Sequence, residues 1–419
     1  MFIVNGGRNL SGKVKISGSK NACLPILAAT LLINGKITLK NVPSIGDVGT
    51  MLEIMGSIGV THKFEGDKLF LDTSNLSIEG LEMEKIKKIR ASILLLAPLL
   101  HFFKKLSIPS PGGCSIGKRP IDSHLNGLKA IGYDYEVTEK TINVFGGEKS
   151  GDTIINAGFG VTGTENLIVA NVLRPGVTTI KSAAIEPHVM NVVDLLRAAG
   201  ADIHIRYDHT IIITGVKELK KEVEFDVISD YIESGTFMII GALASKEFID
   251  IENARISDLY AFIEKLKEAG VKVEDLGNDT LRVYRCDNLK AVTVQTNLYP
   301  GFPTDLQSPF TILLTQAEGI SKIHEVLFES RLNFLVELEK MKGHVAILNP
   351  HEALIFGKTK LKAGASLTSW DLRAGVAMVI AALLTDGETQ VTNIDYIKRG
   401  YSNFVEKMTG LGADIKEVM

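Results

Sequence analysis

The sequence predicts an α/β protein of two domains, each formed by three copies of a βαβαββ unit. One phrase, an amphipathic helix followed by a glycine and a short alternating strand, recurs six times at a spacing of about 70 residues. Each copy also carries an earlier helix that is apolar nearly all round. A chain of 419 residues is too long for one hydrophobic core, so six units favour two domains of three.

The later helix of each unit ends at a glycine. The six segments read MLEIMGSIGVTHKF, LNGLKAIGYDYEV, VVDLLRAAGADIHI, FIEKLKEAGVKVED, LVELEKMKGHVAIL and FVEKMTGLGADIKE. Their glycines are Gly59, Gly132, Gly200, Gly270, Gly343 and Gly412. We expect each glycine to stop its helix in the left-handed conformation that other residues resist. The helices themselves are amphipathic and should face solvent.

The earlier helix of each unit should be buried. These segments read NACLPILAATLLING, RASILLLAPLLHFF, TENLIVANVL, SGTFMIIGALA, DLQSPFTILLTQ and DLRAGVAMVIAALL. The repeats halve near Val227 to Asp230, which predicts a first domain over residues 20–228, carrying the loop of Cys114. The strand-like opening, Phe2 to Ser17, is left over and could complete the last sheet of the second domain. The second domain is therefore predicted to comprise residues 1–19 and 229–419.

Composition and charge narrow the class of function. The formal net charge of -3 gives no global basic field for nucleic acid or an anionic membrane. Three widely spaced cysteines form neither a disulfide framework nor a zinc pattern, and no paired-histidine motif predicts a metal. The N-terminus lacks the apolar region of a signal peptide, and the most apolar stretch is too short to span a bilayer. We expect a soluble cytoplasmic protein without a metal or other cofactor.

Cations recur at equivalent turns of the repeats. They stand where buried helices begin or where strands lead into exposed helices: Lys20, Arg90, Arg119, Arg331, Arg373 and Arg399. Helix N-termini attract anions, and flanking cations strengthen that attraction. Each residue alone could be a solvated surface cation, but the set at equivalent positions predicts a site for a small polyanion.

The strongest local signal is the loop PSPGGCSIGKRP, residues 109–120. Prolines and glycines at this density predict a polar loop, and loops of this kind carry function. Cys114 should be exposed there, and nearby Lys118 and Arg119 favour its reactive thiolate. Cys23, inside an apolar helix, and Cys286 are expected to be structural.

Asp305 and Thr304 stand before a buried helix, where both residue types commonly cap a helix. As an alternative, the Asp305 carboxylate could accept a proton from a substrate hydroxyl. His124 could be a ligand or a residue of a helix surface. The glycines of GFGVTGTEN, residues 158–166, could admit a diphosphate, although turns need glycine anyway.

Seven segments spread over the whole chain resemble the UDP-N-acetylglucosamine 1-carboxyvinyltransferases, a family of enolpyruvyl transferases. They are SGSKNACLP, IRASILLLAPLL, PGGCSIGKRPID, GFPTDLQSPF, FESRLNFLVEL, WDLRAGVAMV and KRGYSNFVEKM. The resemblance implies two inside-out α/β barrel-like domains of three repeats each. It also implies transfer of the enolpyruvyl group of phosphoenolpyruvate to UDP-N-acetylglucosamine in peptidoglycan synthesis. These small molecules are the expected partners.

The resemblance also implies residue roles. The phosphate of phosphoenolpyruvate would contact Lys20, Asn21, Arg119 and Arg399, and its carboxylate Arg331 and Arg373. Cys114 would protonate the methylene carbon, and Asp305 would face the sugar hydroxyl. The nucleotide sugar would contact Arg90, Arg119, Pro120, Ile121, Asp122, Ser123, Val161, Asp305 and Leu327. Because the cations lie in both halves of the sequence, we expect substrate binding to close the domains.

Three positions depart from the family pattern: Tyr231, Gly158 and Trp370. They concern nucleotide contacts more than the phosphoenolpyruvate site. An enolpyruvyl transferase acting on shikimate 3-phosphate or a modified nucleotide sugar is therefore one alternative, and Cys114 argues against the shikimate version. A non-catalytic ligand-binding paralogue is another alternative. The combination of Lys20, Cys114, Asp305 and Arg399 argues against it.

Overall fold

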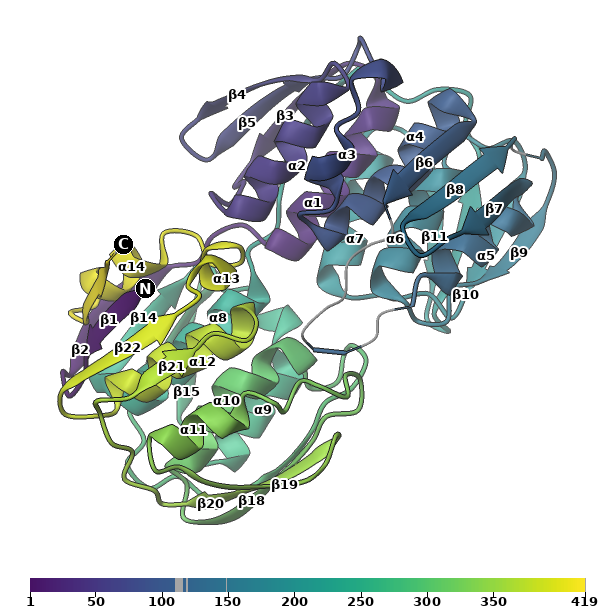
Figure 1. The fold of residues 1–419 in the computed structure, drawn as a ribbon. Coiled ribbons are helices and arrows are strands. Elements are labelled where there is room, and N and C mark those ends of the chain that lie inside the picture. The colour runs from purple at the N-terminus through teal and green to yellow at the C-terminus, as the bar shows by residue number, and fades with distance from the viewer. Residues whose placement is uncertain (110–115, 118–119, 148, 419) are drawn as a thin grey trace. The chain divides into compact units, whose positions relative to one another are not determined.

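The computed structural model describes residues 1–109, 116–117, 120–147 and 149–418. The chain divides into two compact units. Unit 1 comprises residues 1–17, 113–118 and 229–419, and unit 2 comprises residues 18–112 and 119–228. Both are mixed α/β structures in which helices and short strands alternate along the chain, as the colour gradient of Figure 1 shows. The α/β fold class predicted from the repeats is confirmed.

Unit 2 contains three successive repeats. Its helical segments are α1 (Lys20–Thr30), η1 (Leu31–Ile33), α2 (Gly46–Ser57), η2 (Ile78–Gly80), α3 (Met83–Ile86), η3 (Arg90–Leu95), α4 (Leu96–Phe103), α5 (Asp122–Ala130), α6 (Val161–Asn171) and α7 (Pro187–Ala198). Its strands are β3 (Lys36–Lys40), β4 (Thr61–Glu65), β5 (Lys68–Asp72), β6 (Lys105–Pro109), β7 (Tyr133–Val137), β8 (Thr141–Gly146), β9 (Thr153–Asn156), β10 (Val177–Lys181), β11 (Asp202–Arg206), β12 (Thr210–Thr214) and β13 (Glu222–Asp226).

The described strands of unit 2 form three sheets, in the orders β13-β3-β5-β4, β6-β8-β7 and β11-β12-β10-β9. The strand β13 follows the third repeat in the sequence but pairs in parallel with β3 of the first repeat. This pairing closes the set of repeats in space. Apolar residues of the buried helices and of the inner sheet faces form one core.

Unit 1 repeats the plan. Its helical segments are α8 (Tyr231–Ala244), η4 (Ile256–Asp258), α9 (Tyr260–Glu268), η5 (Thr304–Leu306), α10 (Gln307–Thr315), α11 (Leu335–Lys340), α12 (Leu372–Leu383), α13 (Asp395–Lys398) and α14 (Phe404–Gly410). Its strands are β1 (Phe2–Asn5), β2 (Leu10–Lys15), β14 (Ser245–Glu252), β15 (Val273–Gly277), β16 (Thr280–Tyr284), β17 (Thr293–Gln295), β18 (Gly319–His324), β19 (His344–Asn349), β20 (Glu352–Gly357), β21 (Ser366–Thr368), β22 (Glu388–Thr392) and β23 (Asp414–Glu417).

The N-terminal segment belongs to the sheets of unit 1. The orders of those sheets are β21-β22-β1-β23, β15-β16-β14-β2 and β17-β18-β20-β19. The strand β1 pairs antiparallel with both β22 and β23, and β2 pairs in parallel with β14. The first and last parts of the sequence therefore share one sheet (Figure 1).

The apolar helices are buried, as predicted. Every residue of α8 and α10 is buried, whereas α9 buries only Phe262, Ile263 and Leu266. The predicted helix over residues 90–103 differs in its first half, which is the 3-10 segment η3. Pro98 accounts for this boundary, because its missing N–H is tolerated in the first turn of α4 but not in the interior of a longer α-helix.

Five of the six marker glycines adopt the expected positive φ: Gly59, Gly132, Gly200, Gly270 and Gly412. The prediction for Gly343 is wrong, because Lys342 takes the left-handed conformation there, with φ 64°. Gly343 instead allows its backbone to lie close to that of Leu338. Its N–H donates to the Leu338 carbonyl at 2.8 Å, and a Cβ on Gly343 would lie 2.9 Å from that oxygen.

A buried ion pair holds the place where the chain leaves and re-enters unit 1. The Lys407 Nζ donates to the Glu233 carboxylate at 2.5 Å and to the Ser17 hydroxyl at 2.6 Å. The Ser17 N–H donates to the other Glu233 oxygen, and the Asp230 N–H donates to the Ser17 carbonyl. The chain crossings at residues 17/18 and 228/229 are thus tied to α8 and α14.

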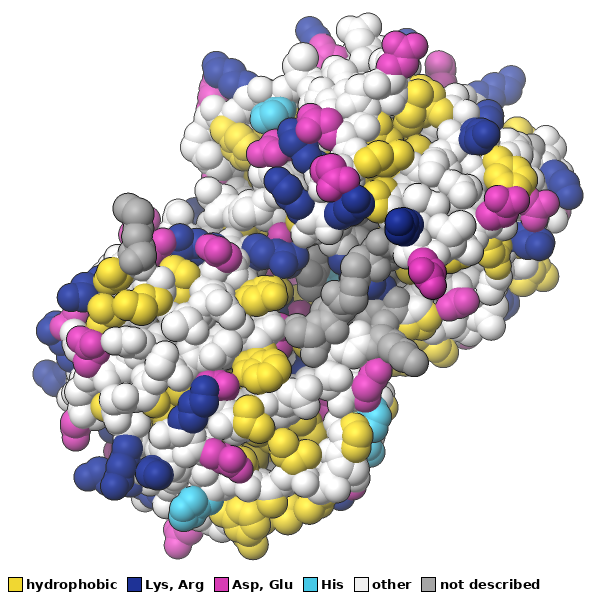
Figure 2. All heavy atoms as spheres, in the orientation of Figure 1, with side chains coloured by type: hydrophobic (Ala, Val, Ile, Leu, Met, Phe, Trp, Pro, Cys, Tyr) yellow, Lys and Arg dark blue, Asp and Glu magenta, His cyan; other side chains and the backbone are white. Residues whose placement is uncertain are grey.

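Among the described residues, no helix is long and apolar enough to cross a membrane. On the face shown in Figure 2, basic and acidic side chains are interspersed. This mixed distribution accords with the small formal net charge of -3.

Candidate active site

Two aspartates cap buried helices of unit 1. Asp230 caps α8, since its side chain accepts from the N–H groups of Ile232 and Glu233. Asp371 caps α12 in the same way. The segment η5 has Pro303 at its N-cap and no side-chain cap. The side chains of Thr304 and Asp305 therefore serve contacts other than the predicted cap.

Asp305 forms ion pairs with two buried arginines. The Arg331 Nη1 lies 2.8 Å from Asp305 Oδ1, and the Arg373 Nη2 lies 3.1 Å from Asp305 Oδ2. The arginine side chains are 4% and 2% exposed, whereas that of Asp305 is 25% exposed. The carboxylate is therefore the part of this group that solvent reaches. The structure thus brings together three of the predicted site residues.

Acidic neighbours keep both guanidinium groups charged. Burial opposes the charge of Arg331, but the carboxylates of Asp305, Asp371 and Glu325 outweigh it and raise the pKa of Arg331. Burial likewise opposes the charge of Arg373, and Tyr401 together with Asp305 outweighs it, so that the pKa of Arg373 is raised. Unit 1 thus holds two permanent positive charges in a largely dry environment.

These arginines also carry buried N–H groups without a protein acceptor. Among the described residues, the Arg331 Nε and the Arg373 Nη1 have no hydrogen-bond partner. A buried, unsatisfied donor costs free energy, and for a charged group the cost is higher still. Both guanidinium groups therefore retain hydrogen-bonding capacity of the kind that carboxylates and phosphates accept. The arrangement is therefore typical of an anion site.

Two further predicted residues of unit 1 lie on short turns. Arg399 is half-buried and directly follows α13. Leu327 is half-buried, and its N–H donates to the Glu325 carboxylate at 3.0 Å. Beside Arg399 in the sequence, the buried Tyr401 places its ring 5.2 Å from the Arg373 guanidinium and its hydroxyl 2.9 Å from Thr236 Oγ1. Tyr401 thus packs against the anion site.

In unit 2, Lys20 is the first residue of α1, and Asn21 follows it. Ser19 caps this helix with its hydroxyl. The Lys20 Nζ lies 2.9 Å from the carboxylate of Asp47, and both side chains are largely buried. Lys20 is therefore a held cation at a helix N-terminus, a position that favours an anion.

The second group of unit 2 surrounds the start of α5. Pro120 and Asp122 are exposed, and Ile121 and Ser123 are half-buried. Ser123 lies against the turn that begins α6, because a Cβ on Gly163 would come within 2.3 Å of its hydroxyl. The half-buried Val161 opens α6, and the half-buried Arg90 opens η3. The predicted nucleotide-sugar contacts Ile121, Ser123 and Val161 thus occupy one region of unit 2.

His124 is neither a surface residue nor exposed to a ligand, because it is buried. The Asn166 amide donates to His124 Nδ1 at 2.8 Å, and Thr162 Oγ1 lies 3.1 Å from His124 Nε2. Burial first, and then the charge of Arg90, lowers the pKa of His124 to about 4. His124 is therefore neutral at physiological pH and carries its proton on Nε2.

Cys114 and Arg119 lie outside the described residues. Two described residues of their loop are placed within unit 1. The Ile116 carbonyl accepts from the Ser330 N–H at 3.1 Å, and Gly117 packs against the Glu329 carboxylate. Cys23 is buried, as expected for a structural residue, and burial raises its pKa.

The three departures from the family pattern have local explanations. Tyr231 is the buried first residue of α8. Gly158 has φ 59° and supplies the left-handed turn before α6, which favours glycine. Trp370 is 39% exposed, and its indole N–H donates to Glu337 Oε1 at 3.2 Å. The first two positions serve the backbone and the core.

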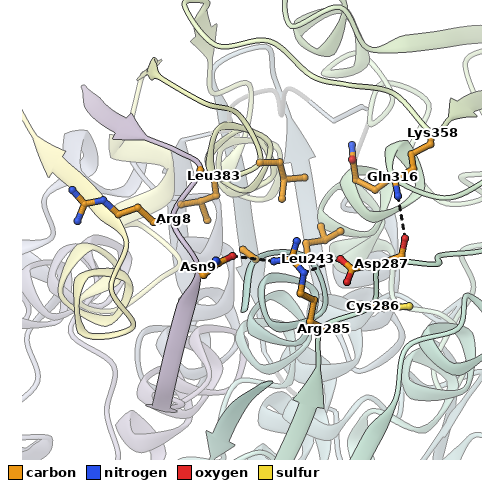
Figure 3. A pocket seen from close by; sticks show the side chains of 12 residues that line it. Arg8, Asn9, Leu243, Arg285, Cys286, Asp287, Gln316, Lys358 and Leu383 are labelled. Atoms are coloured by element: carbon orange, nitrogen blue, oxygen red, sulfur yellow. Dashed lines mark hydrogen bonds and ion pairs between the residues drawn. The ribbon is translucent and has the colours of Figure 1, made fainter. Parts of the chain in front are cut away.

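A separate cavity of about 220 Å³ lies at the C-terminal ends of α8, α10 and α12, within unit 1 (Figure 3). The Arg285 Nη1 donates to the Ser245 carbonyl and to Asn9 Oδ1, and the Lys358 Nζ donates to the Asp287 carbonyl. Cations at helix C-termini complement the helix dipoles. This cavity is therefore explained by the helix ends, which lie opposite the Asp305 group.

Comparison with known proteins defines the class. The family described as EPSP synthase (3-phosphoshikimate 1-carboxyvinyltransferase) matches residues 4–408. The chain therefore belongs to this family. Among solved structures, the enolpyruvyl transferase NikO from Streptomyces tendae superposes with a TM-score of 0.91 at 24% identity, over 100% of this chain and 98% of that one. EPSP synthase from Acinetobacter baumannii superposes with a TM-score of 0.74 at 18% identity, over 100% of both chains. These likenesses confirm the predicted fold.

The curated relatives are more specific. A UDP-N-acetylglucosamine 1-carboxyvinyltransferase of Desulfosudis oleivorans is 41% identical over 100% of this chain and 99% of its own length. One of Carboxydothermus hydrogenoformans is also 41% identical, over 100% and 99%. One of Listeria monocytogenes is 39% identical, over 99% and 97%. The resemblance predicted from the sequence motifs is thus confirmed.

Proposed function

We propose that this protein transfers the enolpyruvyl group of phosphoenolpyruvate to the 3-hydroxyl of UDP-N-acetylglucosamine and releases phosphate. This is the first committed step of peptidoglycan synthesis. Full-length relatives bearing the name of this activity carry the proposal. The pair of buried arginines around Asp305 supports it, because the reaction needs an anion site beside a carboxylate.

The proposed roles follow the chemistry. The oxygen of the sugar hydroxyl bonds to C2 of phosphoenolpyruvate, and Asp305 accepts the proton of that hydroxyl. Cys114 gives a proton to C3, which completes a tetrahedral intermediate. Loss of phosphate from C2 and of a proton from C3 then restores the double bond in the product. The C3 proton returns to the Cys114 thiolate, and the hydroxyl proton leaves Asp305 with the phosphate, so that both residues regain their starting state.

Fixed cations stabilise the charge through these steps without reorganising. Arg331 and Arg373 would hold the carboxylate of phosphoenolpyruvate through their unpartnered N–H groups. The proposed phosphate ligands are Lys20, Asn21, Arg119 and Arg399. The proposed nucleotide-sugar contacts are Arg90, Arg119, Pro120, Ile121, Asp122, Ser123, Val161, Asp305 and Leu327. We further propose that the enzyme works in the cytoplasm, needs no cofactor and acts only on these small molecules.

Release of inorganic phosphate tests the proposal. The purified protein is mixed with phosphoenolpyruvate alone, with UDP-N-acetylglucosamine, and with shikimate 3-phosphate. We expect phosphate, and a nucleotide-sugar product heavier by the enolpyruvyl group, only in the second mixture. Phosphate release with shikimate 3-phosphate but not with the nucleotide sugar would contradict the proposed acceptor. No release in any mixture would favour a ligand-binding paralogue.

A further inference from the structure

A fully buried carboxylate stands behind the Asp305 group. Glu325 directly follows β18 and has no exposed surface. Its Oε1 accepts from Thr296 Oγ1 at 3.0 Å and from the Leu327 N–H at 3.0 Å, and its Oε2 accepts from Thr304 Oγ1 at 2.8 Å. All three donors are neutral. None of the described residues forms an ion pair with this carboxylate.

The placement is costly for a residue that serves packing alone. Burying a charge lowers stability unless the charge is paired or fully hydrogen-bonded. Three neutral donors stabilise the Glu325 carboxylate in part, and the positive charge of Arg331 lies one hydrogen-bonded group further on. The burial of the Glu325 carboxylate is therefore not explained by the folding of β18 alone.

The hydrogen bonds run from Glu325 to the catalytic candidates in a fixed direction. An ionised carboxylate only accepts, so the Thr304 hydroxyl must point its proton at Glu325. The lone pairs of Thr304 Oγ1 then face the other way and accept from Arg331 Nη1 at 2.7 Å. The same Nη1 donates to Asp305 Oδ1 at 2.8 Å. Both protons of Nη1 are thus used.

We propose that Glu325 is a positioning residue for the enolpyruvyl transfer proposed above, on which this inference rests. It orients the Thr304 hydroxyl, and through it fixes the Arg331 guanidinium and the Asp305 carboxylate. Because Nη1 is held by Thr304 and Asp305, the guanidinium of Arg331 is fixed in place, together with its buried Nε, which has no partner among the described residues. A second branch holds the turn of Leu327 through its N–H.

Substitution by glutamine separates this role from simple volume filling. The carboxamide of Glu325→Gln keeps the shape but replaces one acceptor oxygen by an NH₂ donor. At least one of the three donors then faces another donor. If the NH₂ group faces Thr304, its hydroxyl must turn its proton toward Arg331, and the hydrogen bond to Nη1 is lost. A small displacement of this kind can cost about 10²-fold in rate.

A double-mutant cycle in the full-length enzyme tests the proposal. Glu325→Gln and Thr304→Val should each lower kcat/KM for phosphoenolpyruvate by about 10- to 100-fold. Because both act on one hydrogen-bonded chain, the double variant should lose little more than the worse single variant. Thr304→Ser keeps the hydroxyl and should retain most of the wild-type value.

Glu233→Gln is the matched control, because Glu233 is a buried carboxylate of the same unit that pairs with Lys407. It should lower Tm but leave kcat/KM for phosphoenolpyruvate close to that of the wild type. Wild-type kinetics for Glu325→Gln, or losses that multiply in the double variant, would overturn the proposal. If Glu325→Gln does not fold, equal activities of Thr304→Val and Thr304→Ser would overturn it instead. Absence of turnover in the wild-type enzyme would overturn the proposed function itself.

Discussion

The two units start their buried helices in different ways. In unit 1, α8 and α12 are capped by Asp230 and Asp371, and Asp305 stands on η5 before α10. In unit 2, α1 is capped by the neutral Ser19, and α6 begins after Gly160 without a side-chain cap. Carboxylates thus cap α8 and α12 of unit 1, whereas the caps of α1 and α6 in unit 2 carry no charge.

This difference separates two ways of handling negative charge. Unit 1 compensates the Asp305 carboxylate with the buried Arg331 and Arg373, and so places a carboxylate, the proposed base, beside fixed cations. Unit 2 has no carboxylate cap at α1 or α6, and Lys20 opens α1, where it pairs with Asp47. The first arrangement suits proton transfer, and the second suits binding a phosphate or diphosphate.

Removing the base should give the largest effect. Asp305→Asn keeps the shape and much of the hydrogen bonding of unit 1 but cannot accept a proton. We expect kcat to fall by about 10²- to 10⁴-fold, with a much smaller change in the Kd for UDP-N-acetylglucosamine. Steady-state kinetics and calorimetry measure the two quantities. Near-wild-type turnover of Asp305→Asn would show that Asp305 is not the base.

The thiol chemistry should follow next. Treatment with fosfomycin in the presence of UDP-N-acetylglucosamine should modify Cys114, and Cys23 should not react because burial raises its pKa. Cys114→Ser should lose more turnover than Cys114→Asp, since a hydroxyl is a far weaker acid. Intact mass and peptide mapping locate the adduct. Modification confined to Cys23 or Cys286, or unimpaired turnover of Cys114→Ser, would remove Cys114 from the mechanism.

The ion pair at the chain crossings concerns stability rather than rate. Lys407→Met removes the cation that faces the buried Glu233 and should lower the free energy of unfolding by about 3–5 kcal/mol. Lys398→Met is the control, because Lys398 pairs with Glu417 on the exposed surface and should cost about 0–1 kcal/mol. Denaturant titration measures both. Equal losses would show that the buried pair has no special weight.

The smallest expected effect concerns a glutamate of unit 2. Burial first, and then the charge of Glu186, raises the pKa of Glu165 well above its usual range. The folded state therefore holds this proton more tightly than the unfolded chain does. The stability that this proton contributes is present below about pH 4.5 and is lost as pH rises through the raised pKa.

Glu165→Gln cannot ionise, so this part of the pH dependence should disappear. We expect the Tm of the variant to rise relative to that of the wild-type protein as pH increases. The shift should be about 2–4 °C for each kcal/mol of difference in unfolding free energy. Thermal unfolding across the pH range measures the difference. In unit 1, Glu233→Gln should instead lower Tm at neutral pH, because it leaves Lys407 without its carboxylate. The same direction for both variants would contradict the contrast between the units.

Sequence periodicity predicts the fold well, because each unit buries an apolar helix and ends an amphipathic one at a glycine. Gly343 departs from this pattern because Lys342 adopts the left-handed conformation and leaves glycine only a steric role. Local propensity also favoured a helix cap at Asp305. The Asp305 side chain instead forms ion pairs with Arg331 and Arg373, which are distant in the sequence. Local helix propensity contains no information about such contacts.

Other parts of the site are invisible to sequence patterns. Glu325 stands at the end of an ordinary strand, and its partners Thr296 and Thr304 come from other elements. In the sequence, Asp47 is likewise a common acidic residue in the first turn of a helix. Only the structure shows its ion pair with Lys20. The roles of Cys114 and Arg119, outside the described residues, stay predictions.

The position of β1 has a consequence for synthesis on the ribosome. This strand is translated before the rest of both units, yet it lies between β22 and β23, which are translated after them. Its sheet cannot form until residues up to Glu417 have emerged, whereas the sheets of unit 2 need nothing beyond Asp226. Unit 2 can therefore fold while unit 1 is still being made. Until residues up to Glu417 have emerged, the strand that contains the apolar Phe2 and Val4 lacks its β-sheet partners.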